Sequence, residues 1–103
     1  MAYRVVVAPV ARDDLIEIGE YIAQDSPDNA RQWVAQLEQA IASLSSMPER
    51  VAKRDDLRTG YHVLPVGSHL IFFRIIEHEA QIARVIHAAR AREIAEAFEK
   101  PSR

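Results

Sequence analysis

The chain contains no cysteine, only two lysines and no apolar run long enough to cross a bilayer. Without cysteine it can form neither a disulfide bond nor a thiolate metal site, which fits a reducing compartment. The apolar run at the N-terminus is too short for a signal peptide. We therefore expect a soluble, cytoplasmic protein that does not associate with a membrane.

Histidine is also sparse. His62, His69 and His78 are scattered over predicted loops and strand ends, and no His-x-x-x-His or Glu pairing accompanies them. A metal ion needs several such ligands at a regular spacing. The sequence thus predicts neither a metal site nor a cofactor.

The size and charge of the chain suggest one domain with two different surfaces. A chain of 103 residues, 49% of them apolar, can form one core, so we expect a single domain over residues 1–103. Residues 1–49 hold three arginines against eight acidic residues, whereas residues 50–103 hold ten basic against seven acidic residues. This asymmetry suggests two faces with different partners, although acidic helices alone would also produce it.

The first half of the chain predicts a strand followed by a helical hairpin. Residues 3–8 are β-branched and apolar, as in a strand, and Pro9 suits the first turn of a helix. Ser26 is a natural N-cap for a second helix, with Pro27 at its first position, and this helix is expected to end near Met47. Each helix has one apolar stripe: Ala11, Leu15, Ile18 and Ile22 in the first, and Ala30, Trp33, Val34, Leu37, Ile41 and Leu44 in the second.

The second half predicts three strands and a short helix. We expect strands at about residues 61–64, 69–76 and 81–88, turns at residues 66–68 and 77–80, and a last helix over residues 91–100. Short links of this kind produce an antiparallel meander. The element order is then β-α-α-β-β-β-α, an α+β fold in which a helical hairpin packs on one face of a mainly antiparallel sheet.

Alternation along the middle strand assigns its side chains to two faces of the sheet. Ile71, Phe73 and Ile75 form the more continuous apolar set and should face the helices. The opposite face, which we term the far face, stays open unless a partner covers it, and it should present Leu70, Phe72, Arg74 and Ile76. Arg84 interrupts the next apolar strand, and whether it joins the far face depends on the hairpin register.

A set of short motifs extends in order along the chain, from Tyr3 to about Arg92. The motifs are Ala11-x-x-Asp14-Leu15, Tyr21-Ile22-Ala23, Ser26-Pro27-x-x-Ala30, Leu44 with Pro48, Leu57-Arg58-x-Gly60-Tyr61, Pro65-Val66-Gly67-Ser68-His69, Phe73-Arg74 and Ile82-x-Arg84-Val85-Ile86-His87-x-x-Arg90. The ordered set resembles the RelE/ParE superfamily of bacterial type II toxin–antitoxin toxins, and its ParE branch most closely. The chain departs from the family pattern after Arg90, where an acidic residue is common and Ala91 stands here.

The resemblance implies a small toxin that is neutralised by a cognate antitoxin encoded beside it. ParE-like members poison DNA gyrase, whereas RelE-like members cut messenger RNA on the ribosome. We expect an antitoxin with a DNA-binding N-terminal part and an acidic C-terminal segment, and DNA gyrase as the possible target. We expect no direct binding of nucleic acid by this chain.

The residues themselves favour a toxin that acts by binding rather than an enzyme. RelE-like cleavage needs a general base, a general acid and cations around the phosphate. RelE-like enzymes use an aromatic hydroxyl near the C-terminus, and no tyrosine follows the last predicted strand here. One set could replace that chemistry: His87 with Arg74, Arg84 and Arg90. Ribosome-dependent cleavage and a non-toxic regulatory module that only binds antitoxin remain the alternatives.

Two binding surfaces are predicted. Acidic and apolar side chains of the antitoxin should meet the far face at Leu70, Phe72, Arg74, Ile76 and Arg84. The target should meet the basic exit of the last strand and the motif around Gly60, through Arg58, Tyr61, His87, Arg90 and Arg92. His87 also has a structural alternative, which is to cap the sheet by bonding the backbone or a carboxylate such as Glu20.

Overall fold

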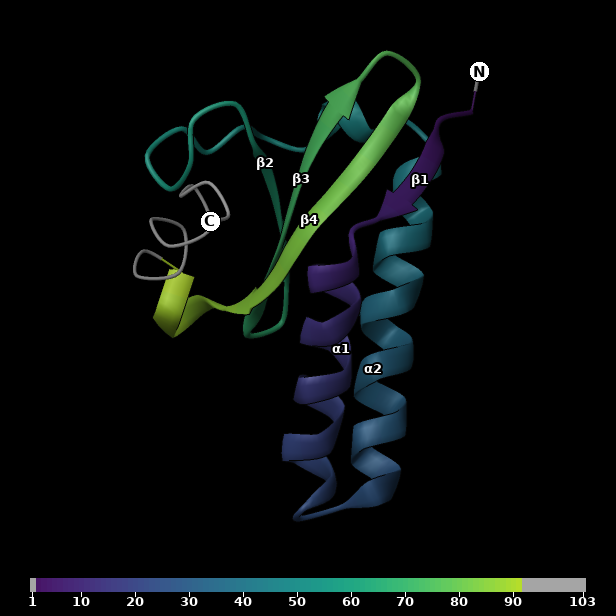
Figure 1. Cartoon of the computed structure of the whole chain (residues 1–103), viewed down its shortest axis with the longest axis vertical. Helices are drawn as coiled ribbons and strands as arrows, with labels where there is room; N and C mark the ends of the chain where they lie inside the picture. The colour runs from purple at the N-terminus through teal and green to yellow at the C-terminus, as the bar shows by residue number, and fades with distance from the viewer. Residues whose placement is uncertain (1, 92–103) are drawn as a thin grey trace.

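The structure is a computed structural model that describes residues 2–91, and it has the predicted α+β architecture (Figure 1). Its helices and strands are β1 (Arg4–Val7), α1 (Pro9–Ala23), α2 (Pro27–Ala42), β2 (His62–Val66), β3 (His69–Ile76) and β4 (Glu79–His87). Three short 3-10 helices complete the described part: η1 (Ser43–Ser45), η2 (Pro48–Arg50) and η3 (Ala88–Arg90). Apart from Ala91, the predicted last helix lies outside the described residues.

The helical hairpin begins where the sequence predicts. Pro9 is the first residue of α1, and the side chain of Ser26 accepts a hydrogen bond from the Asn29 backbone N–H at the start of α2. Such a cap satisfies an N–H group that has no partner inside the helix. Figure 1 shows α1 and α2 side by side as an antiparallel pair.

The second helix ends earlier than expected. It stops at Ala42 rather than near Met47, and η1 continues the chain. The Ser43 hydroxyl donates to the Ala40 carbonyl, and Met47 adopts a left-handed backbone conformation (φ 52°) before η2 begins. Serine side chains compete with helical hydrogen bonding in this way, so the serine-rich segment 43–46 ends the regular helix.

The four strands form one sheet in the order β1-β4-β3-β2. β1 runs parallel to β4, and the other two pairs are antiparallel. β2 contains a proline, Pro65, which it can accommodate because it lies at an edge of the sheet. The neighbouring Val63 N–H points away from β3 toward the Ala52 carbonyl, so the Pro65 nitrogen, two residues on, also faces away from β3 and interrupts no ladder bond.

The turns are tighter than predicted. Only Gly67 and Ser68 connect β2 to β3, and only Glu77 and His78 connect β3 to β4, so Glu79 and Ala80 belong to β4. Glu77 has a positive φ of 55°, as two-residue hairpin turns require. These turns fix which residues of the three strands lie opposite one another.

The core has two parts, one on each side of the sheet. The helix-facing cluster consists of Ala11, Leu15, Leu37, Ile41, Leu44, Ile71, Phe73, Ala80, Ile82 and Val85. Ile75 packs against this cluster, so the predicted helix-facing set is confirmed. Among the described residues, no helix is long and apolar enough to cross a membrane.

The second cluster corrects the prediction that Phe72 lines an open face. Phe72 has no exposed surface, and it packs on the far face with Tyr61, Val63, Ile86 and Ala91. Leu57 and Leu70 pack against the same cluster. The loop before β2 and the residues after β4 therefore contribute to the far side of the sheet. Phe72 lies on the predicted face but is enclosed there, whereas Arg74 and Ile76 on the same face are exposed.

Candidate functional site

Arg84, which interrupts the apolar strand β4, forms a buried ion pair with Asp14 of α1. Its Nε and Nη2 atoms donate to the two carboxylate oxygens of Asp14 at 2.8 and 2.9 Å. The two side chains are only 18% and 10% exposed. This two-point geometry is the strong form of an arginine–carboxylate pair. The bond to Asp14 also raises the pKa of the Arg84 guanidinium.

A β-bulge beside Arg84 divides the side chains of β4 between the two faces of the sheet. Phe73 lies opposite Ile82, but Phe72 lies opposite Arg84, so β4 contains one extra residue, Ala83, at this point. Strict alternation would have directed Ile82, Arg84 and Ile86 to one face. With the bulge, Ile82 and Val85 enter the helix-facing core while Ile86 enters the far cluster. The bonds to Asp14 decide the question that the sequence left open: the Arg84 guanidinium lies beside α1 and not on the far face.

Asp14 also binds the backbone of β4 at the bulge. Its Oδ2 accepts the Val85 backbone N–H at 2.9 Å. β1 pairs with β4 only as far as Ile82, so β1 offers no partner to this part of β4. A buried N–H without a partner would be costly. The carboxylate therefore takes the place of a neighbouring strand at this position.

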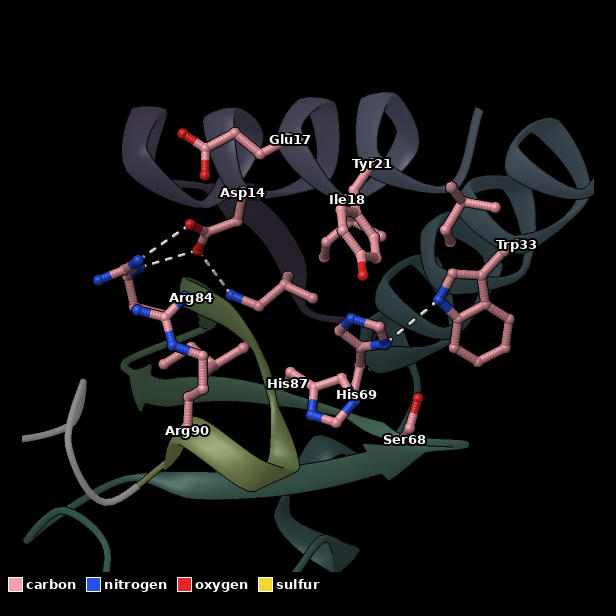
Figure 2. Close-up of a pocket in the computed structure, with 13 residues that line it drawn as sticks. Asp14, Glu17, Ile18, Tyr21, Trp33, Ser68, His69, Arg84, His87 and Arg90 are labelled. Carbon is pink, nitrogen blue, oxygen red and sulfur yellow. Dashed lines mark hydrogen bonds and ion pairs between the residues drawn. The ribbon is translucent and has the colours of Figure 1, made fainter. Parts of the chain in front are cut away.

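A groove lies beyond this ion pair, between the C-terminal half of α1 and the ends of β3 and β4. Its volume is about 790 Å³. Its lining residues are Asp14, Glu17, Ile18, Tyr21, Ile22, Trp33, Ser68, His69, Arg84, Val85, Ile86, His87 and Arg90 (Figure 2). Apolar side chains thus occur together with two arginines, two histidines and two acidic residues. Tyr21 is 74% exposed, which leaves a large aromatic side chain available at the groove.

The groove contains a cluster of three rings: Trp33, His69 and His87. The Trp33 Nε1–H donates to His69 Nδ1 at 3.2 Å, and the centroids of the two histidine rings lie 5.2 Å apart in an edge-on arrangement. His87 Nδ1 accepts the Ala89 backbone N–H at 3.1 Å, so the predicted structural alternative for His87, bonding to the backbone, is present. Burial lowers the pKa of His69, and the positive charge of a protonated His87 lowers it further.

Gly67 explains how Trp33 fits against the sheet. The backbone of Gly67 is left-handed (φ 57°), and a Cβ atom there would lie 2.5 Å from Cη2 of Trp33. Only glycine meets both conditions without strain. The indole therefore lies directly on the β2–β3 turn, and its N–H is held by the first residue of β3.

The far face contains a separate polar cluster around Tyr61. The guanidinium carbons of Arg58 and Arg74 lie 4.9 and 5.9 Å from the centroid of the Tyr61 ring. These are cation–π distances. Arg74 is exposed, and Ile76 follows it on the same face with 39% exposure.

The structure divides both predicted binding sets. Of the predicted antitoxin-binding residues, Leu70, Arg74 and Ile76 lie on the far face, Phe72 is buried beneath that face, and Arg84 lies in the groove. Of the predicted target-binding residues, Arg58 and Tyr61 lie on the far face, His87 and Arg90 line the groove, and Arg92 lies outside the described residues. Arg74 thus joins Arg58 and Tyr61, and Arg84 joins His87 and Arg90.

Asp14 and His69 belong to this site although the sequence did not predict a role for either residue there. Asp14 is an acidic residue that is not among the apolar residues of the first helix, yet it is only 8% exposed. Its spacing gave a signal: it follows Ala11 by three residues and precedes Ile18 by four, which puts it on the buried side of the helix. His69 had no local signal, because its partner Trp33 lies 36 residues away.

The fold and the groove together indicate the class of protein to which this chain belongs. A helical hairpin on one face of a small mixed sheet, with a groove of mixed charge between hairpin and sheet, is an architecture suited to binding a protein segment. Among residues 2–91, no three histidine, aspartate or glutamate side chains gather as a metal site would need.

Comparison with known proteins identifies the family. Residues 5–92 match the family model described as the ParE toxin of the type II toxin–antitoxin system parDE. The chain therefore belongs to the ParE toxin family of type II toxin–antitoxin systems. Two relatives, both named Toxin ParE1 and found in two strains of Mycobacterium tuberculosis, are 32% identical over 89 residues, which covers 84% of this chain and 91% of each relative.

Solved structures show the same fold. A chain from the chromosomal ParDE system of P. aeruginosa superposes with a TM-score of 0.74 at 21% identity, over 84% of this chain and 96% of that one. A chain from the RelBE2 toxin–antitoxin complex of Mycobacterium tuberculosis superposes with a TM-score of 0.58 at 25% identity, over 84% and 99%. The predicted fold class and the predicted family are both confirmed.

Proposed function

We propose that this chain is neutralised by a cognate antitoxin whose C-terminal segment lies in the groove between α1 and the ends of β3 and β4. The groove is the observation that supports this proposal. It offers apolar contacts at Ile18, Ile22 and Trp33 beside the cations Arg84 and Arg90. Solved relatives of this fold come from toxin–antitoxin systems, which supports an antitoxin as the occupant.

The chemistry of the groove specifies the antitoxin segment. Leu, Ile or Phe anchors on one face of an amphipathic helix would fill the apolar part. Acidic residues of the same helix would face Arg90 and His87, both of which are exposed at the groove. Arg84 already has Asp14 as its partner, so its charge is largely neutralised within the chain. Arg90 is more exposed than Arg84, so the antitoxin's carboxylates should approach Arg90 more readily.

A charge reversal tests this placement. Arg90→Glu should weaken the complex with the antitoxin by ~2 kcal/mol or more, because it sets like charges opposite each other. Arg50→Glu is the matched control, since Arg50 is exposed on η2 and does not line the groove. Calorimetric titration of each variant with the antitoxin gives the comparison. Equal affinities for both variants and the parent chain would place the antitoxin elsewhere.

We further propose that the toxin acts by binding DNA gyrase and not by catalysis. The four residues that could replace the RelE-like catalytic groups do not lie together in the structure. They are Arg74, Arg84, His87 and Arg90. Arg74 lies beside Tyr61 on the far face, Arg84 is paired with Asp14, and only His87 and Arg90 line the groove together. General acid–base catalysis needs its groups within hydrogen-bonding reach of one substrate. This dispersal favours a binding mechanism.

Two assays separate the candidate activities. Purified gyrase should lose supercoiling activity when this protein is added and regain it when the antitoxin follows. Ribosomes translating a defined message should show no new cleavage. Cleavage of the message without an effect on gyrase would favour the RelE-like alternative. Silence in both assays would favour a module that only binds antitoxin.

A further inference from the structure

His69 is bonded in a way that depends on its protonation state. It is the first residue of β3, only 8% exposed, and its Nδ1 accepts the Trp33 Nε1–H. An indole N–H can only donate. The bond therefore requires a lone pair on Nδ1, and the single proton of the neutral ring must lie on Nε2.

Protonation of His69 would place two donors opposite each other. The new Nδ1–H would point at the Trp33 N–H, so the bond would be lost and a charge would remain in a buried site. Trp33 has little room to adjust by moving toward the turn, because its ring already lies against Gly67. The indole would have to move out of its place in the groove wall.

The groups around His69 mostly oppose its protonation. His87 of β4 faces it edge-on, and Arg84 and Arg90 line the same groove. Figure 2 shows the hydroxyl of Tyr21, from α1, directed toward the His69 ring. The acidic groups of the groove are Asp14 and Glu17 of α1, and both act on Arg84: Asp14 is paired with it, and the charge of Glu17 also raises the pKa of its guanidinium. Burial and the neighbouring positive charges thus agree with a pKa of His69 below the ordinary histidine value.

We propose that His69 is a proton-sensitive contact that controls the shape of the groove. While His69 is neutral it holds Trp33 in the wall, and when it is protonated it releases the indole. Because the pKa of folded His69 lies below the unfolded value of about 6.5, this stabilisation is complete above the unfolded value. It is lost as the pH falls through the folded value.

Trp33 is the single tryptophan of the chain, so its fluorescence reports on this contact directly. Between pH 8 and pH 4.5 the emission should change in one sigmoidal step with a midpoint below about 6.5, the ordinary histidine value. Circular dichroism in the far ultraviolet should remain unchanged through that step. A first change that coincides with loss of helical signal would overturn the proposal, because it would mean unfolding.

Two variants assign the step to its residue. In His69→Gln the side-chain oxygen can still accept the Trp33 N–H but cannot take a proton, so the step should disappear. In His87→Gln the step should remain and move to higher pH, because a like charge has been removed. Persistence of the step in His69→Gln would refute the assignment.

A second measurement covers the case in which His69→Gln does not fold. Nuclear magnetic resonance of the histidine Cε1–H protons gives the titration of His69 in the parent chain and in Trp33→Phe, which lacks the donor. His69 should titrate at higher pH in Trp33→Phe. An unchanged titration would show that the Trp33 bond does not control the proton.

The consequence for the antitoxin rests on the proposed function. If the antitoxin occupies the groove, lowering the pH from 7.5 to 5.5 should weaken its binding through His69, because the released indole no longer forms part of the groove wall. The His69→Gln variant should therefore bind the antitoxin more tightly at pH 5.5, relative to pH 7.5, than the parent chain does. The two proposals can fail separately. If the fluorescence of the parent chain shows the expected step but His69→Gln does not change the ratio of antitoxin affinities at pH 5.5 and pH 7.5, the contact between His69 and Trp33 stands and the antitoxin binds outside the groove.

Discussion

At the scale of single residues, Asp14 has two structural roles. It neutralises Arg84 and it accepts the backbone N–H of Val85, and both interactions are buried. Removing one member of a buried ion pair leaves the other charge without compensation, which costs more than the pair itself contributes. Loss of Asp14 should therefore destabilise this fold more than loss of an exposed acidic residue.

We expect Asp14→Asn to lower the free energy of unfolding by ~3 kcal/mol, at the lower end of the range for broken buried pairs because the site is slightly exposed. Asp13→Asn is the matched control, since Asp13 is the adjacent residue and is exposed. Urea unfolding of both variants measures the difference. Equal stabilities would mean that the ion pair contributes little to the fold.

Gly67 and Gly60 provide a second comparison between single residues. Both have positive φ angles, but only at Gly67 would a Cβ atom meet a neighbour, the Trp33 ring. Gly60→Ala should cost about 1 kcal/mol from the backbone alone. Gly67→Ala should cost roughly 1–3 kcal/mol more because of overpacking, and it should also shift the Trp33 emission. Thermal unfolding and fluorescence together test this; equal losses would argue against the close contact.

At the scale of elements, capping sets the position of α2. Ser26 caps its start with a side-chain hydrogen bond, and Pro27 supplies a fixed φ at its first position. α1 has a proline at its first position but no side-chain cap, because Ala8 cannot supply one. The hairpin must then rely on its apolar packing for most of its stability.

Ser26→Ala should lower the free energy of unfolding by about 1 kcal/mol, the usual cost of losing an N-cap. Ser46→Ala is the control, since Ser46 is exposed and lies outside both helices. Denaturant titration followed by circular dichroism measures both. The cap would be judged unimportant if the two substitutions had the same effect.

At the scale of the whole molecule, the sheet separates two polar surfaces. The groove surface contains Arg84, His87 and Arg90, and the far face contains Arg58 and Arg74. The sequence predicted one set of residues for the antitoxin and another for the target, and the fold divides each set between the groove surface and the far face. Because the strands lie between them, a partner held in the groove does not reach the far face without extending around an edge of the sheet.

This separation predicts independent effects of charge reversal on the two faces. Arg74→Glu should change antitoxin affinity by less than ~0.5 kcal/mol, whereas Arg90→Glu should cost ~2 kcal/mol. Effects of the two substitutions should add in the double variant, since distant sites without shared partners are additive. Should Arg74→Glu alone weaken the complex strongly, the antitoxin binds the far face, as the sequence suggested.

The sequence by itself determined the helical hairpin, the four strands and their order along the chain. Apolar residues at helical spacing, the Ser26-Pro27 cap and alternation in residues 69–76 are local patterns, and local patterns fix local structure. The same alternation assigned Ile71, Phe73 and Ile75 to the helix side. The resemblance of the ordered motifs to ParE-like toxins was sufficient for the family.

Only the tertiary structure decided which charges are available to a partner. Arg84, beside the bulge in β4, pairs with Asp14, 70 positions away in the chain, and packing of Tyr61 and Ala91 encloses Phe72. The bond between Trp33 and His69 likewise joins α2 to β3. Bulges and pairings of this kind arise from contacts between distant segments, so no pattern within one segment encodes them.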